Sequence, residues 1–207
     1  FTDPILVAGC QRSGTTMLTR LISKSPAMQN FRIRKDDELD AALILSGKQG
    51  LSPTGRYCFQ TSYLNDRYVE YFEHSNFKLV WMVRNPESVI NSLINNWARG
   101  PLERLFKSCG VYRMNKAQIA KYDRWGSLAF TKLEKACLCY NAKTSQIHEI
   151  TERLGCEVVV SLDYDEFVAE PRRHMSHLAG FLGLDYDEKS VAMIRRNSVK
   201  KFESLTV

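Results

Sequence analysis

Short apolar runs alternate along the chain with longer stretches of helical periodicity. The clearest run, residues 77–83, is almost continuously apolar, as expected of a parallel strand that is buried on both faces. Residues 5–8 and 156–162 form two further apolar runs of strand length. These three runs predict strands of one sheet.

Stretches with apolar residues at helical spacing follow or separate these runs. The spacing predicts helices over residues 17–22, 35–45, 65–74, 87–97, 125–153, 172–182 and 187 to about 196. Residues 31–34 alternate as in a short strand. Strands that alternate with helices indicate an α/β fold with three layers, α/β/α, around a central parallel sheet.

One segment resists this interpretation. Residues 98–125 are basic and irregular, and we interpret them as an excursion or an acceptor-side lid within a single domain that covers residues 1–207. The long helix predicted after this segment places Leu128 and Leu133 at core-like positions. Gly155 is expected to end that helix.

The first apolar run leads into a glycine loop and then into a helix, the layout that holds a phosphate group. The loop fits the P-loop pattern G-x-x-x-x-G-K-S/T at Gly9, Gly14 and Thr16, which predicts a topology like that of P-loop NTPases. Thr15 stands where that pattern has lysine, and Arg12 is the cation inside the loop. Ordinary ATP or GTP chemistry is therefore disfavoured, and another phosphate-bearing donor is expected.

A second candidate anion site follows the run at 77–83. Arg84, Asn85 and Pro86 come directly after this strand, and Pro86 opens the next helix. Ligands of open parallel sheets bind at the carboxyl ends of the strands. The glycine loop and Arg84 are thus expected at the same edge of the sheet.

Composition and charge narrow the function classes. The chain has 207 residues, of which 44% are hydrophobic and 25% charged, as in ordinary globular proteins. The net charge of +6 favours an anionic ligand, although a generally basic surface gives the same number. The basic residues are not interleaved with an aromatic stacking platform, so nucleic acid is not expected as a partner. No apolar run approaches the roughly 18–20 residues of a membrane span.

The six cysteines contain no C-x-x-C pair, so neither a zinc site nor another metal site is expected. Reduced thiols and the lack of a visible signal peptide are typical of a cytoplasmic protein.

Three separated motifs together resemble those of the sulfotransferases that use 3′-phosphoadenosine-5′-phosphosulfate (PAPS). Residues 11–16 are similar to the 5′-phosphosulfate loop of that family, and Arg84 with Ser92 is similar to its 3′-phosphate motif. Residues 164–167, Pro171 and residues 181–184 resemble a pattern late in the domain. Many relatives have lysine at the position of Arg12. In having arginine in this loop, the sequence resembles the bacterial, carbohydrate and tyrosylprotein branches of the family.

The resemblance implies in-line transfer of a sulfonyl group from PAPS to an acceptor hydroxyl or amine, with release of adenosine 3′,5′-bisphosphate (PAP) and without a metal ion. It gives Arg12 the role of an electrostatic clamp on the leaving phosphate. The residues that it assigns to the donor are Arg12, Ser13, Gly14, Thr15 and Thr16 at the 5′ end, Arg84 and Ser92 at the 3′-phosphate, Tyr164 near adenine, and Ser198 and Lys200 in a closing tail.

The general base and the acceptor are less defined. The acceptor must lose a proton as it attacks, and related branches use a glutamate after the first helix, which favours Glu38 over Asp36, Asp37 and Asp40. The acceptor can be a small molecule, lipid, glycan or peptide, and residues 46–60 and 98–125 are expected to contact it. A P-loop kinase-like phosphotransferase and a non-catalytic nucleotide-binding module remain as alternatives.

Overall fold

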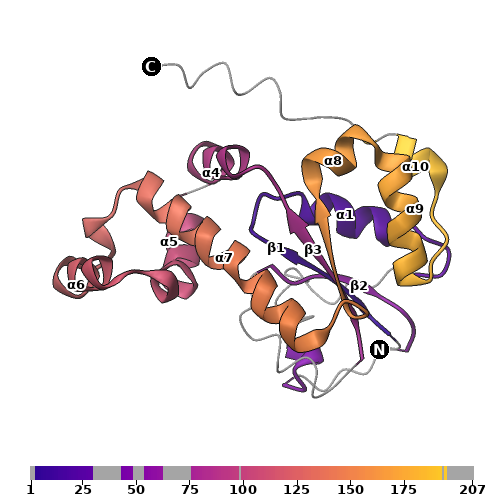
Figure 1. The fold of residues 1–207 in the computed structure, drawn as a ribbon, viewed down its shortest axis with the longest axis horizontal. Helices are drawn as coiled ribbons and strands as arrows, with labels where there is room; N and C mark the ends of the chain where they lie inside the picture. Colours follow the sequence, from indigo (N-terminus) through magenta and orange to yellow (C-terminus); the bar gives the residue numbers. More distant parts are fainter. Residues whose placement is uncertain are drawn as a thin grey trace.

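The computed structural model describes residues 3–29, 43–48, 54–62, 76–97, 99–192 and 194. Within them, four parallel strands form one sheet in the order β2-β1-β3-β4 (Figure 1). The strands are β1 (Ile5–Gly9), β2 (Cys58–Gln60), β3 (Lys78–Val83) and β4 (Val159–Asp163). Leu6 of the central strand β1 lies opposite Phe59 of β2 and Leu79 of β3. The expected parallel sheet is confirmed.

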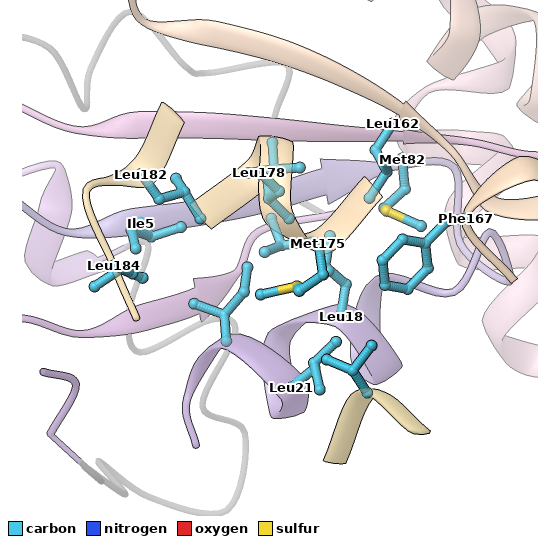
Figure 2. Close-up of a cluster of buried hydrophobic side chains, with 14 of the residues drawn as sticks. Ile5, Leu18, Leu21, Met82, Leu162, Phe167, Met175, Leu178, Leu182 and Leu184 are labelled. Atoms are coloured by element: carbon cyan, nitrogen blue, oxygen red, sulfur yellow. The ribbon is translucent and has the colours of Figure 1, made fainter. Parts of the chain in front are cut away.

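Alternate residues of each strand enter separate cores on the two faces of the sheet. Ile5 and Met82 face α1 (Thr15–Ile22) and α9 (Pro171–Leu182), whose side chains meet them in the cluster of Figure 2. Leu6 and Trp81 enter a second cluster with Ile150 of α7 (Lys132–Leu154). Helices therefore cover both faces, and the three-layer α/β/α arrangement is confirmed.

A third core lies beside the sheet, where helices pack on one another. Val89 of α4 (Pro86–Asn95), Phe106 of α5 (Arg99–Ser108) and Cys139 of α7 are all buried in it. Pro86 stands at the first position of α4, and the Asn85 side chain accepts a hydrogen bond from the backbone N–H of Ser88. This cap sets the direction in which the chain leaves β3.

The segment after α4 is helical, which corrects the expectation of an irregular excursion. It consists of α5, the 3₁₀ helix η2 (Gly110–Arg113) and α6 (Lys116–Trp125). A capping box begins α6. The Asn115 side chain accepts a hydrogen bond from the backbone N–H of Gln118, and the Gln118 side chain accepts one from the backbone N–H of Asn115. Basic surface positions weakened the hydrophobic periodicity without preventing helix formation.

The long helix starts later than the periodicity predicted. Gly126 ends α6, a 3₁₀ turn η3 (Gly126–Ala129) follows, and α7 begins at Lys132. Leu128 and Leu133 are therefore exposed, whereas the sequence placed them in the core. Gly155 ends α7 at φ +83°, as expected.

Two of the carboxyl-terminal helices, α9 and α10, begin near the predicted positions, whereas α8 was not predicted. Asp163 caps α8 (Tyr164–Ala169) by accepting hydrogen bonds from two backbone N–H groups of its first turn. Gly183 ends α9 in the left-handed conformation, and α10 (Glu188–Ala192) packs beside α9 (Figure 1).

Several expected elements fall outside the described residues. These are the strand at 31–34, the helix at 65–74, most of the helix at 35–45 and the end of the helix expected to reach about 196. None of the helices in the described part of the chain is both long enough and apolar enough to cross a membrane.

Candidate functional site

The glycine loop after β1 depends on two positions that only glycine fits. Gly9 has φ +134°, and a Cβ added there would lie 2.4 Å from the carbonyl oxygen of Met82. Gly14 has φ +93°, and a Cβ there would lie 2.4 Å from Cδ2 of Tyr164. Arg12 also has a positive φ, +74°. The loop is therefore a tight turn fitted against β3 and α8.

A cavity of about 330 Å³ opens over this loop. It lies where β1, β2 and β3 end and α1 begins, the position at which open parallel sheets bind ligands. Its lining contains five of the predicted donor-binding residues together with three others: Gln11, Arg12, Gly14, Thr15, Thr16, Gln60, Arg84 and Trp97. The volume is that of a small-molecule site.

Hydrogen bonds join the loop to the second predicted anion motif. Arg84 donates from Nη1 to the carbonyl oxygen of Arg12 at 2.9 Å. Arg12 in turn donates from Nε to the Ser92 hydroxyl at 3.0 Å. Residues 72 to 80 positions apart in sequence thus form one connected cluster of two cations and a hydroxyl.

The backbone around Arg84 is fixed by side chains from two other elements. The Tyr140 hydroxyl of α7 donates to the Arg84 carbonyl oxygen at 2.9 Å. Burial raises the pKa of Tyr140, so the phenol stays protonated as a donor. The Asp165 carboxylate accepts from the backbone N–H of Asn85 at 3.1 Å.

Tyr164 lies beneath the cluster. Tyr164 is 6% exposed, and a Cβ added at Gly14 would clash with its ring. The Arg84 guanidinium stacks 4.3 Å above the ring centroid. This arrangement supports the loop and orients the arginine. Contact between Tyr164 and adenine stays a prediction.

The site fits an anion with several oxygen atoms. Nε of Arg84 and the hydroxyl of Ser13 are buried, and neither finds a hydrogen-bond partner among the described residues. A phosphate or sulfonate oxygen would accept from such donors. The N-terminal end of α1 carries partial positive charge, which adds to that of the two arginines, and no acidic residue in its first turn offsets it.

The loop cysteine takes no part in this chemistry. Cys10 is fully buried, and burial raises its pKa to about 12, so its thiol stays protonated and acts as a packing group. No cluster of His, Cys, Asp and Glu side chains suited to a metal ion occurs in the ranges that the structure describes.

Two lining residues were missed by sequence reasoning. Gln60 ends β2, and its Oε1 accepts a hydrogen bond from the Thr16 hydroxyl at 2.7 Å. Trp97 follows α4 and forms part of the cavity wall. The rule that sites gather at strand ends identifies Gln60 once β2 is known, but a three-residue strand leaves little periodicity to detect.

The remaining predicted site residues lie outside the described part of the chain. They are the candidate base Glu38, its rivals Asp36, Asp37 and Asp40, and the tail residues Ser198 and Lys200. Their roles stay predictions.

Comparisons with solved structures find sulfotransferases. The sulfotransferase domain of the curacin biosynthetic pathway aligns with a TM-score of 0.58 at 14% identity, covering 92% of this chain and 77% of that one. The sulfotransferase domain of the Synechococcus PCC 7002 olefin synthase gives 0.56 at 17% identity, covering 92% and 76%. A mouse sulfotransferase, SULT7A1, complexed with PAP gives 0.51 at 16% identity, covering 95% and 63%. At these identities the likeness shows a shared fold.

A search of curated proteins found no match. The sequence itself, however, matches the sulfotransferase domain family over residues 2–205. Because this match spans nearly the whole chain, the protein belongs to the sulfotransferase family.

Proposed function

We propose that this sulfotransferase uses PAPS as its donor and transfers the sulfonyl group to an acceptor hydroxyl or amine, releasing PAP. The observation that carries the proposal is the hydrogen-bonded cluster of Arg84, Arg12 and Ser92 beside the glycine loop. Its two arginines, at one edge of the sheet, would bind the two separate anionic groups of such a donor. The PAP in the mouse relative's structure agrees with such a donor.

The glycine loop would hold the 5′ end of the donor. Backbone N–H groups and hydroxyls of Ser13, Thr15 and Thr16 surround the start of α1, where dipoles favour negative charge. Arg12 is exposed at this loop, and an arginine supplies a planar cation with several N–H donors. It therefore acts as a fixed positive charge for the oxygen that gains charge as PAP leaves, and not as a proton donor.

Arg84 and Ser92 would bind the 3′-phosphate. Because the Arg84 guanidinium is held by the Arg12 carbonyl oxygen and the Tyr164 ring, little side-chain entropy is lost when an anion binds. Ser198 and Lys200 are proposed to close over the same phosphate. No metal ion is required by this scheme, because fixed cations take the role that Mg²⁺ has in ATP sites.

The acceptor would enter past Gln60 and Trp97, which also line the cavity and come from other segments than the two arginine motifs. We assign Glu38 as the base that removes the acceptor proton. Glu38→Gln is expected to lower turnover while PAP affinity holds, since a neutral amide cannot accept the proton. Turnover equal to that of the wild type would exclude Glu38.

The acceptor class is tested separately. Small-molecule, lipid, glycan and peptide acceptors can be compared in one panel with labelled donor.

Calorimetric titration tests the donor. PAP is expected to bind tightly in the absence of Mg²⁺, and ATP and GTP are expected to bind far more weakly with or without the metal. Preference for ATP with Mg²⁺ would contradict PAPS use and favour a kinase-like phosphotransferase. Tight PAP binding without turnover against a broad acceptor panel would favour a non-catalytic module.

A further inference from the structure

The strongly exposed large hydrophobic side chains of the described residues all come from one segment. We call residues 112–133 the basic tip; it runs from η2 through α6 and η3 into the first turn of α7. The side chains and their exposed fractions are Tyr112 (77%), Ile119 (45%), Trp125 (61%), Leu128 (93%) and Leu133 (56%). Single exposed hydrophobic residues are ordinary, but their concentration in one segment marks an interaction surface.

The same segment carries a large share of the protein's positive charge. It contains five Lys or Arg residues and one Asp, a net charge of +4 in a chain whose total is +6. Lys116, Arg124 and Lys132 are exposed beside the apolar side chains. Apolar and cationic groups side by side suit a partner with an anionic surface layer over an apolar interior.

The basic tip is a built structure with a packed inner side. Tyr122 and Phe130 form an aromatic cluster with Phe106 of α5, with ring centroids 5.4 to 6.4 Å apart. Capping boxes at Asn115 and Thr131 fix the starts of α6 and α7. The exposed hydrophobic residues are thus held outward by a segment whose inner side is already packed.

The shape of the surface favours a lipid bilayer over a protein groove or a second copy. Leu128 is 93% exposed on the η3 turn, so it protrudes, and α6 lies at one end of the molecule, farther from the sheet than α5 (Figure 1). Protruding Trp and Leu side chains flanked by Lys and Arg are typical of interfacial anchors. Two basic tips would bring their exposed cations Lys116, Arg124 and Lys132 together and would repel one another.

We propose that the basic tip docks the protein on bilayer surfaces with anionic headgroups, Trp125 and Leu128 entering the interface and the cations meeting the headgroups. The lining of the donor cavity includes no residue of the basic tip, so this inference does not rest on the proposed donor.

Vesicle flotation of the full chain tests the proposal. The protein is expected to float with vesicles of phosphatidylserine and phosphatidylcholine in equal parts, to stay behind with pure phosphatidylcholine, and to be released by salt. Trp125 fluorescence should shift to shorter wavelength on binding, whereas buried Trp81 should contribute no shift. The shift should disappear in Trp125→Phe while flotation persists.

Matched variants separate local docking from general charge attraction. Trp125→Ser with Leu128→Ser, and separately Lys116→Glu with Lys132→Glu, are each expected to weaken vesicle binding at least about tenfold. Arg172→Glu with Lys189→Glu changes the net charge as much as the second pair, on exposed positions of α9 and α10, and should keep binding within about twofold. Unchanged thermal unfolding confirms that each variant is folded.

Several results would overturn the proposal. They include equal binding to both kinds of vesicle, binding to neither, equal loss in the α9–α10 control, and a dimer in solution that Leu128→Ser abolishes. The last would assign the surface to a second copy. Retention of an acidic protein by the basic tip without any vesicle binding would likewise replace the lipid surface with a protein partner.

Discussion

At the scale of single residues, the site depends on backbone conformations that most side chains avoid. Arg12 has φ +74° although it has a Cβ, and it lies between Gly9 and Gly14, which also have positive φ. Such conformations persist where the surrounding structure determines them. Here the hydrogen bond from Arg84 to the Arg12 carbonyl oxygen is part of that surrounding structure.

Gly14→Ala is expected to destabilise the protein by about 1–3 kcal/mol, because alanine is strained at φ +93° and its Cβ would meet the Tyr164 ring. Denaturant unfolding measures the loss. Gly180→Ala on α9 is the control, since a Cβ added at Gly180 would lie in open space. This variant is expected to gain about 0.5–1 kcal/mol of unfolding free energy. Equal stability changes in the two variants would show that the loop tolerates a side chain at Gly14.

Arg84→Ala is expected to weaken PAP binding by about 1.5–3 kcal/mol, the contribution of a hydrogen bond to a charged group. Calorimetry measures it, with Arg172→Ala on the exposed side of α9 as the control. Arg84→Lys should recover part of the affinity, because it keeps the charge without the fork of donors. Wild-type affinity in Arg84→Ala would place the 3′-phosphate elsewhere.

The sequence was informative for residues whose chemistry has a fixed spacing. Arg12, Gly14, Thr15, Thr16 and Arg84 were all predicted and all line the cavity. The burial of Tyr164 beneath Arg84 could not be predicted, because it depends on how α8 packs on the loop.

At the scale of elements, helix starts are set by capping groups as much as by hydrophobic spacing. Thr131 and Glu134 each bond the other's backbone N–H group and fix the start of α7. Sequence periodicity did not mark this boundary, because Leu133, just inside α7, keeps helical spacing with Ala136 and Tyr140 although it is exposed. The capping box satisfies backbone N–H groups at the start of α7, and Gly126 ends α6, so these two features set the helix boundaries in place of the hydrophobic pattern.

The cap also gives stability a pH dependence. The backbone N–H of Thr131, followed by Lys121, lowers the pKa of Glu134 from 4.5 to about 2. Because the folded pKa is the lower one, the stabilisation is present above pH 4.5 and is lost as pH falls toward 2. Glu134→Gln should therefore be less stable than the wild type at neutral pH and equal to it near the lower pKa. Unfolding curves over this range measure the difference, and a gap that persists in acid would refute the ionic origin.

At the scale of the whole molecule, the two faces of the sheet give the chain its stability. Leu178 of α9 is 3% exposed in the core of Figure 2, whereas Leu133 of α7 is 56% exposed. Leu178→Ala is expected to cost about 2–5 kcal/mol of unfolding free energy. Leu133→Ala should change it by less than about 0.5 kcal/mol. Chemical denaturation measures both changes. A large loss of unfolding free energy in Leu133→Ala would show that Leu133 packs in a core.

The overall architecture was largely predictable, because strands buried on both faces leave continuous apolar runs such as 77–83. The positions of α5 and α6 were not. Their basic surfaces blur the periodicity. In addition, α5 packs on α7 through contacts between residues far apart in sequence, and α6 packs against η3.

The hydrogen bond between Arg84 and the Arg12 backbone has a consequence for how the two motifs behave under substitution. Since each motif holds part of the other in place, their contributions to affinity are not additive, and removing both arginines should cost a different amount from the sum of the single losses. For the proposed donor, a ligand with only one of the two anionic groups is expected to leave one of the two arginines without a counterion. We therefore expect selectivity for a doubly anionic donor to depend on both motifs together.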